Sequence, residues 1–134
     1  MKLILDTNIL VSALIFSGIA ADIFDEAVRY HYVFLTENIL NEFSNTLQSK
    51  LKVPKSDTLR YSKHLRSGFT VVSPDNPMPE VCRDKKDNHL LQLSEFVSAN
   101  YLITGDKDLL VLDQFGITSI VDMRTYRSKN PKFQ

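Results

Sequence analysis

The sequence predicts a single α/β domain built on a parallel β-sheet that carries helices on both faces. Short apolar runs, which suit strands buried on both faces, alternate with longer segments whose apolar residues recur at helical spacing. Strands separated by helices in this way are joined by right-handed crossovers into a parallel sheet. The 134 residues, 43% of them hydrophobic, suffice for one domain with a real core, and no second domain is expected.

Composition limits the class and the location of the protein. The 16 basic residues balance the 16 acidic ones, so any affinity for nucleic acid must come from how charge is distributed. The single cysteine, Cys82, excludes an internal disulfide and a zinc site of several cysteines within one chain, which suits a reducing cytosol. No apolar run approaches the roughly 18 residues of a membrane span, and Lys2 followed by a strand is not a signal peptide. We therefore expect a cytoplasmic protein that does not associate with membranes.

The first strand and the first helix meet at an acid. Residues 3–5 form a buried strand, and apolar residues recur at helical spacing over residues 9–15, so the chain passes from strand to helix at Asp6-Thr7-Asn8. Ligands of open α/β sheets bind outside the carboxyl ends of the strands, where Asp6 can meet a ligand or a metal. Alternatively, Asp6 or Thr7 only caps the helix, and these residues alone do not decide between the two interpretations.

The next segments predict a second helix over residues 19–30, a second strand over 32–36 and a third helix that Glu37 or Asn38 caps. Glu42 lies on the flank of the apolar stripe of the third helix. This position suits a carboxylate that reaches past the rim of the core toward a site. A solvated helix acid is an equally good interpretation.

The most basic stretch of the chain surrounds a fourth helix, predicted from Lys55 to about Ser67 with Gly68 as its stop. The stretch could follow a phosphate backbone, or it could be an ordinary solvated helical face. A third strand over residues 69–72 follows it. The basic residues are Lys50, Lys52, Lys55, Arg60, Lys63, His64 and Arg66.

A proline-containing loop over residues 73–79 leads to a helix on which Asp87 lies over the apolar side of the first turn. A carboxylate in that place either caps the helix or serves as a site ligand close to the positive end of the helix dipole. A fourth strand over residues 101–104 is followed at once by Gly105 and Asp106, so a second acid stands directly past a strand.

The last segments complete the domain. Residues 114–116 predict a turn, residues 117–121 a fifth strand, and Asp122 the cap of a short helix that ends near Arg127. We expect a domain over residues 1–127 and a frayed tail over residues 128–134.

Four acids are candidates for one site. Asp6 and Asp106 would emerge at the same edge of a parallel sheet, and Glu42 and Asp87 are the best candidates to join them. Four carboxylates in one crevice raise each other's pKa values, so the arrangement makes physical sense chiefly with a divalent cation. Oxygen ligands favour Mg²⁺ first and Mn²⁺ next, and such ions can bind and polarise phosphate.

Other phosphate and hydrolase chemistries lack their usual residues. No glycine-rich phosphate loop precedes a Lys-Ser or Lys-Thr pair, and no Gly-x-Ser-x-Gly elbow presents a serine. A phosphatase of the haloacid dehalogenase type would carry an aspartate where Asn8 stands. His31, His64 and His89 show no ligand spacing and are interpreted as surface or helix residues.

Four segments together resemble the PIN-domain family, and in particular its toxin-like group, over nearly the whole chain. They are Leu5-Asp6-Thr7-Asn8, the helix with Glu42, residues 83–88, and Thr104-Gly105-Asp106-Lys107-Asp108. The resemblance implies a three-layer α/β/α domain whose five-stranded parallel sheet has the order 3-2-1-4-5. It also implies an endoribonuclease that needs Mg²⁺ or Mn²⁺ and leaves 5′-phosphate and 3′-hydroxyl ends. The implied partners are RNA, a small antitoxin whose tail occupies the cleft, and a second copy of the chain.

The resemblance also assigns residues. Asp6, Glu42, Asp87 and Asp106 match the four acids of the family and would be both the catalytic residues and the metal ligands. Thr7, Asn8 and Thr104 match polar residues that orient the ligands or a water. Asp84 is the alternative to Asp87, and Asp108 is either a further acid of the site or a helix-start residue. The basic residues that would hold RNA are Arg83, Lys85, Lys86, Lys55, Arg60 and Lys63.

Two other functions stay open at this level. A PIN domain whose nuclease activity is weak or lost would bind RNA or protein without cutting. A phosphoesterase that acts on small molecules would use the same metal.

Overall fold

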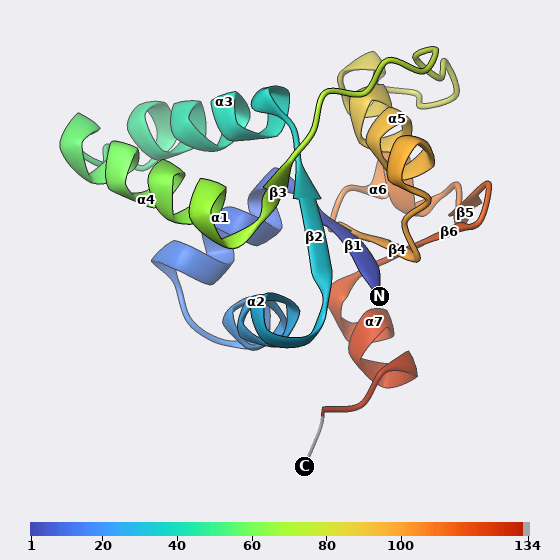
Figure 1. Ribbon diagram of the computed structural model, residues 1–134, viewed down its shortest axis with the longest axis horizontal. Coiled ribbons are helices and arrows are strands. Elements are labelled where there is room, and N and C mark those ends of the chain that lie inside the picture. Colours follow the sequence, from blue (N-terminus) through green and yellow to red (C-terminus); the bar gives the residue numbers. More distant parts are fainter. Residues whose placement is uncertain (133–134) are drawn as a thin grey trace.

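A computed structural model describes residues 1–132 and shows one six-stranded sheet between layers of helices (Figure 1). The strand order is β3-β2-β1-β4-β6-β5, and all neighbours are parallel except β5, which runs antiparallel to β6. The predicted five-stranded parallel order is confirmed, with β6 in the fifth place. The strands are β1 (Lys2–Leu5), β2 (Tyr32–Leu35), β3 (Thr70–Val71), β4 (Tyr101–Ile103), β5 (Gln114–Phe115) and β6 (Thr118–Val121).

The chain turns at Gly116, within the predicted turn over residues 114–116, but the strand at Gln114–Phe115 was not predicted. Gln114 pairs with Ser119 and Phe115 with Thr118, so the segment forms a short hairpin with β6. Gly116 has a φ of 58°, the left-handed conformation that lets a chain reverse within two residues between paired strands. A strand of two residues is too short for any apolar alternation to show in the sequence.

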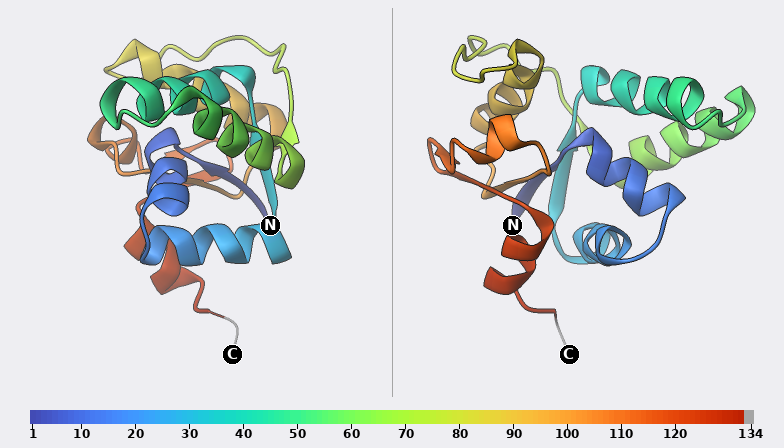
Figure 2. Two further views of the ribbon diagram at one scale, coloured as in Figure 1. Left: turned by 90° about the vertical axis from the view of Figure 1, so that its left-hand side faces the viewer. Right: turned by 180° about the vertical axis from the view of Figure 1, so that it is seen from behind.

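Helices cover both faces of the sheet, which confirms the predicted three layers. In Figures 1 and 2, α1 to α4 lie on one side of the strands and α5 and α6 on the other, while α7 packs against α2. A π-helical turn over Thr46–Lys50 continues α3, and a 3-10 turn over Lys85–Asp87 precedes α5. The helices are α1 (Thr7–Ile15), α2 (Ile19–Tyr30), α3 (Glu37–Asn45), α4 (Lys55–Gly68), α5 (Asn88–Val97), α6 (Lys107–Leu110) and α7 (Met123–Lys129).

Side chains cap the starts of α3 and α7. Thr36, and neither Glu37 nor Asn38, caps α3, because its hydroxyl accepts a hydrogen bond of 3.2 Å from the backbone N–H of Ile39. Asp122 caps α7 as predicted and accepts from the N–H of Thr125 at 2.7 Å.

The end of the chain was predicted as a tail. Helix α7 continues to Lys129, two residues past the predicted end near Arg127. The division into a domain over 1–127 and a tail over 128–134 stays a prediction, and its residues 133 and 134 lie outside the described residues.

The core forms around β1. Leu3, Ile4 and Leu5 are fully buried, as expected of a central parallel strand covered by helices on both faces. Within residues 1–132, no single helix has the length and hydropathy of a membrane span, although α1 and α2 taken together, with a 100° bend between them, have the length and composition of one.

A mostly buried ion pair ties α2 to α7. Nη1 of Arg127 lies 2.6 Å from Oε2 of Glu26, and their side chains are 19% and 10% exposed. His31, at the end of α2, lies 3.7 Å from the same carboxylate and receives a contact of 3.1 Å from the N-terminal amine. The pair therefore joins the last helix to α2, and His31 adds a contact from the segment between α2 and β2.

Replacing Arg127 by methionine is expected to lower the free energy of unfolding by about 2 to 3 kcal/mol, because it leaves Glu26 charged and desolvated without its partner. Chemical denaturation with urea measures the change. The double variant Glu26→Leu/Arg127→Met should recover most of the loss, and Arg124→Met, at an exposed position of the same helix, serves as the matched control. A loss below about 0.5 kcal/mol, typical of a surface substitution, would contradict the prediction.

Candidate metal centre

An acidic cleft of about 340 Å³ opens at the carboxyl ends of the central strands. The start of α1, the flank of α3, the turn before α5 and the segment after β4 supply its walls. All four acids of the predicted site line it. The lining residues are Asp6, Thr7, Asn8, Glu42, Asn45, Thr46, Lys50, Asp84, Lys86, Asp87 and Asp106.

Asp6 lies at the bottom of this cleft, directly after β1. Its backbone N–H donates to the carbonyl of Ile103 at 3.0 Å, which extends the pairing with β4 by one residue. Its side chain makes no capping hydrogen bond to α1 and instead accepts from the hydroxyl of Thr104 at 2.6 Å. Helix capping therefore does not account for this carboxylate. Burial raises the pKa of Asp6, and the negative charges of Asp106 and Glu42 raise it further.

Thr104 connects two of the acids from beneath. It is fully buried, and its hydroxyl oxygen, which donates to Asp6, accepts from the backbone N–H of Asp106 at 3.0 Å. Asp106 in turn caps α6, with Oδ1 accepting from the N–H of Asp108 at 2.9 Å. Thr104 thus orients Asp6 and the backbone that presents Asp106.

Glu42 is held on the opposite wall by two donors. Its Oε2 accepts from the hydroxyl of Thr7 at 3.0 Å, and its Oε1 lies 3.0 Å from Nε2 of His89. The hydrogen bond from His89 is the main cause of a lowered pKa of Glu42, despite partial burial. Asn8, by contrast, lines the cleft with an exposed side chain.

His89 is the site residue that sequence reasoning missed. The three histidines lack the spacing of metal ligands, so His89 was not predicted as a site residue. However, positions 89, 93 and 97 recur every fourth residue on α5, and all three are buried. A histidine on an apolar stripe is buried, and a buried imidazole needs a polar partner. That pattern was the available signal.

Asp87 has a strongly raised pKa in the cleft. It precedes α5 but makes no capping hydrogen bond, and its Oδ2 is buried without a hydrogen-bond partner among the described residues. Burial, the adjoining carboxyl of Asp106 and the negative charges of Asp84 and Asp6 raise the pKa of Asp87 to about 7. The site interpretation of Asp87 therefore fits its contacts better than the capping one.

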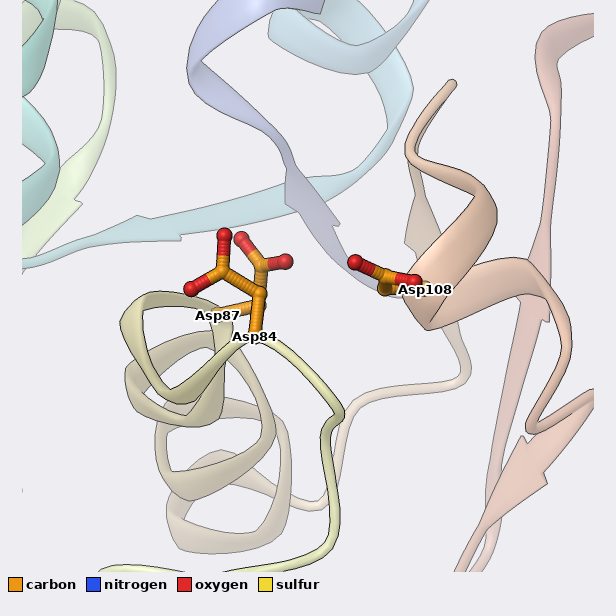
Figure 3. Close-up of side chains that lie close together, drawn as sticks. All are labelled: Asp84, Asp87 and Asp108. Atoms are coloured by element: carbon orange, nitrogen blue, oxygen red, sulfur yellow. The ribbon is translucent and has the colours of Figure 1, made fainter.

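Asp84, Asp87 and Asp108 also form a cluster (Figure 3). Each offers one oxygen, and the three oxygens lie within 4.8 Å of one another. In Figure 3, Asp84 and Asp87 project from the turn before α5, and Asp108 projects toward them from α6. Asp108 is therefore both a first-turn residue of α6 and a neighbour of the site acids.

The acids of the cleft and of the neighbouring Asp84, Asp87 and Asp108 cluster fit a divalent cation. The donor set is entirely carboxylate oxygen, which suits Mg²⁺ or Mn²⁺, and the orphaned Oδ2 of Asp87 is a buried acceptor that a cation would satisfy. Which of the acids bind the ion stays a prediction.

The basic residues divide into two groups. Lys50 and Lys86 line the acidic cleft, and Arg83 and Lys85 line a neighbouring hollow beside Cys82. Lys55, Arg60 and Lys63 are exposed on α4, and Arg60 pairs with Asp57. The structure does not place these three among the residues that line the cleft.

The fold and the site together define an α/β domain that has an acidic cleft at the carboxyl edge of a mostly parallel sheet. Comparison with family models then identifies it: the PIN domain model matches residues 2–108, which include Asp6, Glu42, Asp87 and Asp106. The chain belongs to the PIN domain family.

The chain is also similar to individual proteins. An uncharacterised protein of Methanocaldococcus jannaschii is 34% identical over 116 residues, which are 83% of this chain and 74% of that protein. Two solved structures share the fold. The first is VapBC2 from Rickettsia felis, bound to a DNA fragment from its promoter, with a TM-score of 0.66 at 9% identity. The match covers 91% of this chain and 98% of that chain. The second is PAE2754 from Pyrobaculum aerophilum, with a TM-score of 0.62 at 20% identity. The match covers 96% of this chain and 88% of that chain.

Proposed function

We propose that the protein is an endoribonuclease that depends on Mg²⁺ or Mn²⁺ and acts as the toxin of a toxin–antitoxin pair in the cytoplasm. The observation that carries the proposal is the convergence of Asp6, Glu42, Asp87 and Asp106 on one cleft, with a pKa of Asp87 raised to about 7. Acids that repel each other at a sheet edge make an anionic pocket suited to a hard cation.

The chain's own residues have distinct parts in this proposal. Asp6, Asp87 and Asp106 would hold the cation from the sheet side and Glu42 from α3, while Asp84 and Asp108 form a cluster with Asp87. Thr104 and Thr7 fix the carboxylates of Asp6 and Glu42 through hydrogen bonds. When bound, the ion would polarise a phosphodiester oxygen and make a bound water more acidic.

The proposed protein partners are a small antitoxin and a second copy of the chain. The fold shared with VapBC2 supports the antitoxin, and the homodimer stays an expectation from the resemblance to toxin-like PIN domains. RNA is the proposed substrate, because the cleft combines anionic metal ligands with flanking Lys50 and Lys86.

The test is cleavage of a mixed pool of single-stranded and structured RNA by the full chain, with Mg²⁺ or Mn²⁺ and in a parallel sample with a chelator. We expect cutting that needs the metal and leaves 5′-phosphate ends. A folded protein that binds Mn²⁺ but cuts no RNA would favour a PIN domain that binds RNA or protein without cutting. Hydrolysis of a small phosphodiester such as bis-p-nitrophenyl phosphate, without RNA cleavage, would favour the small-molecule phosphoesterase.

Replacing both Lys50 and Lys86 by alanine is expected to weaken RNA binding and to flatten its salt dependence. Each phosphate contact to a single strand contributes a slope of about 0.7 in log K against log salt, so two lost contacts reduce the slope by up to about 1.4. Fluorescence anisotropy with labelled RNA at several salt concentrations measures this.

The matched comparison is Lys55→Ala/Lys63→Ala, which removes the same charge from the exposed face of α4. A larger effect of that pair would move the RNA path from the cleft to α4, as the charge pattern of the sequence first suggested.

A further inference from the structure

His89, on the first turn of α5, makes a contact that the proposed metal ligands do not explain. Its side chain is 9% exposed, and its Nε2 lies 3.0 Å from Oε1 of Glu42. Its Nδ1 is buried without a hydrogen-bond partner among the described residues. Burying an imidazole with one nitrogen unpaired costs stability. The ring is therefore poorly suited to serve as core filler alone.

The contact joins two walls of the cleft. Glu42 comes from α3 and His89 from α5, which lie on opposite sides of the strands at the same end of the molecule (Figure 1). Asp87, two residues before His89, lines the same cleft as Asp6 and Asp106. The first turn of α5 thus contacts both halves of the acidic site.

Glu42 is restrained at both of its oxygens. Thr7 of α1 donates to Oε2 and His89 lies at Oε1, each at 3.0 Å, although the Glu42 side chain is 41% exposed. A free glutamate side chain loses rotamer entropy when a ligand fixes it. Two donors that fix it beforehand remove part of that cost from cation binding. Each carboxylate oxygen accepts more than one bond, so both retain capacity for a cation.

We propose that His89 is a positioning residue, whose Nε2–H holds the Glu42 carboxylate in one orientation as the acid that α3 contributes to the divalent-cation site. The inference rests on the proposed function for the presence of a cation, but it concerns metal affinity and does not depend on the substrate. Hydrogen-bond partners of metal ligands typically change metal affinity or activity by 10- to 100-fold when they are removed.

The test measures Mn²⁺ affinity of the full chain by isothermal titration calorimetry. His89→Phe keeps the ring volume without a donor, and His89→Gln places an amide N–H near the position of Nε2. We expect His89→Phe to weaken Mn²⁺ binding by about 10- to 100-fold and His89→Gln by less than about threefold. In a Glu42→Gln background, His89→Phe should have no further effect, because it acts through Glu42.

Leu93→Ala is the matched control for helix damage. Leu93 is fully buried one turn further along α5, so its loss destabilises the protein without touching the site. It should leave Mn²⁺ affinity unchanged at a temperature where the variant is folded. If His89→Phe does not fold, His89→Asn replaces it, because its amide reaches the position of Nδ1 and not that of Nε2. Its expected loss of affinity is the same.

A folded His89→Phe or His89→Asn that binds Mn²⁺ like the wild type overturns the inference, and so does a wild-type protein that binds no Mn²⁺. Affinity lost in His89→Phe and kept in His89→Gln supports it. The proposed function fails separately: a wild-type protein that binds Mn²⁺ but cuts no RNA refutes the nuclease, while the affinities of the His89 variants still decide the positioning role.

Discussion

Asp6→Asn is expected to reduce metal-dependent RNA cleavage by at least about 100-fold, which corresponds to about 2.7 kcal/mol of activation free energy. The substitution removes one ligand charge and leaves the shape of the side chain nearly unchanged. Asparagine still has an oxygen that can accept the hydrogen bond from Thr104, so the local structure is preserved. Since losing a partner of a ligand already costs 10- to 100-fold, losing a ligand should cost at least the upper value.

The same substitution is expected to raise the thermal midpoint of the metal-free protein. The raised pKa of Asp6 means that its charged form is disfavoured by burial and by Asp106 and Glu42, and a neutral side chain removes that repulsion. Activity and stability should therefore move in opposite directions, as is common for residues placed for function. Thermal unfolding in a chelator and initial cleavage rates with Mn²⁺ measure the two effects.

Asp25→Asn is the matched control, because it removes the same charge from an exposed position of α2 that does not line the cleft. It should change neither property. Cleavage by Asp6→Asn at more than about a tenth of the wild-type rate would remove Asp6 from the metal site. Reduced activity together with reduced stability would mean that Asp6 supports the fold and not the chemistry.

The parts of the fold that local pattern determines were predictable. Strand β1 is visible as an apolar run, and the position of Asp6 and Asp106 at one edge follows from the rule that parallel strands end at the same edge. The strand order came from the resemblance to a family and not from periodicity. Strand β5 was not predicted, because its two residues are too few to show the alternation of apolar and polar residues that marks a strand.

The parts of the site that depend on helix orientation were not predictable. Glu42 and His89 are 47 positions apart on two helices, and their contact depends on how α3 and α5 are rotated over the sheet. The approach of Asp108 to Asp84 depends likewise on where the short helix α6 begins. Local spacing indicated which acids stand near the sheet edge, but it carried no information on which donors hold them.

Mn²⁺ affinity is expected to fall about tenfold for each pH unit below 7 and to level off above it. Because the pKa of Asp87 is raised to about 7 in the metal-free fold, a proton occupies this carboxyl in competition with the cation below that pH. Calorimetry in two buffers of different ionisation enthalpy should show about one proton released per ion at pH 6 and almost none at pH 8.5. Asp87→Asn should abolish this release, and affinity that does not change between pH 5.5 and 7.5 would contradict the assignment.

The stability of the metal-free protein has the corresponding pH dependence. The pKa of Asp87 is about 7 in the fold against 3.8 as the ordinary value, so between pH 4 and 7 the folded state binds more protons than the unfolded state. The contribution of Asp87 is therefore fully present below pH 4 and is lost as the pH rises through 7. The thermal midpoint of wild type in a chelator should fall over this window relative to Asp87→Asn, and saturating Mn²⁺ should reverse the trend, because the cation replaces the proton as the partner of the carboxylate.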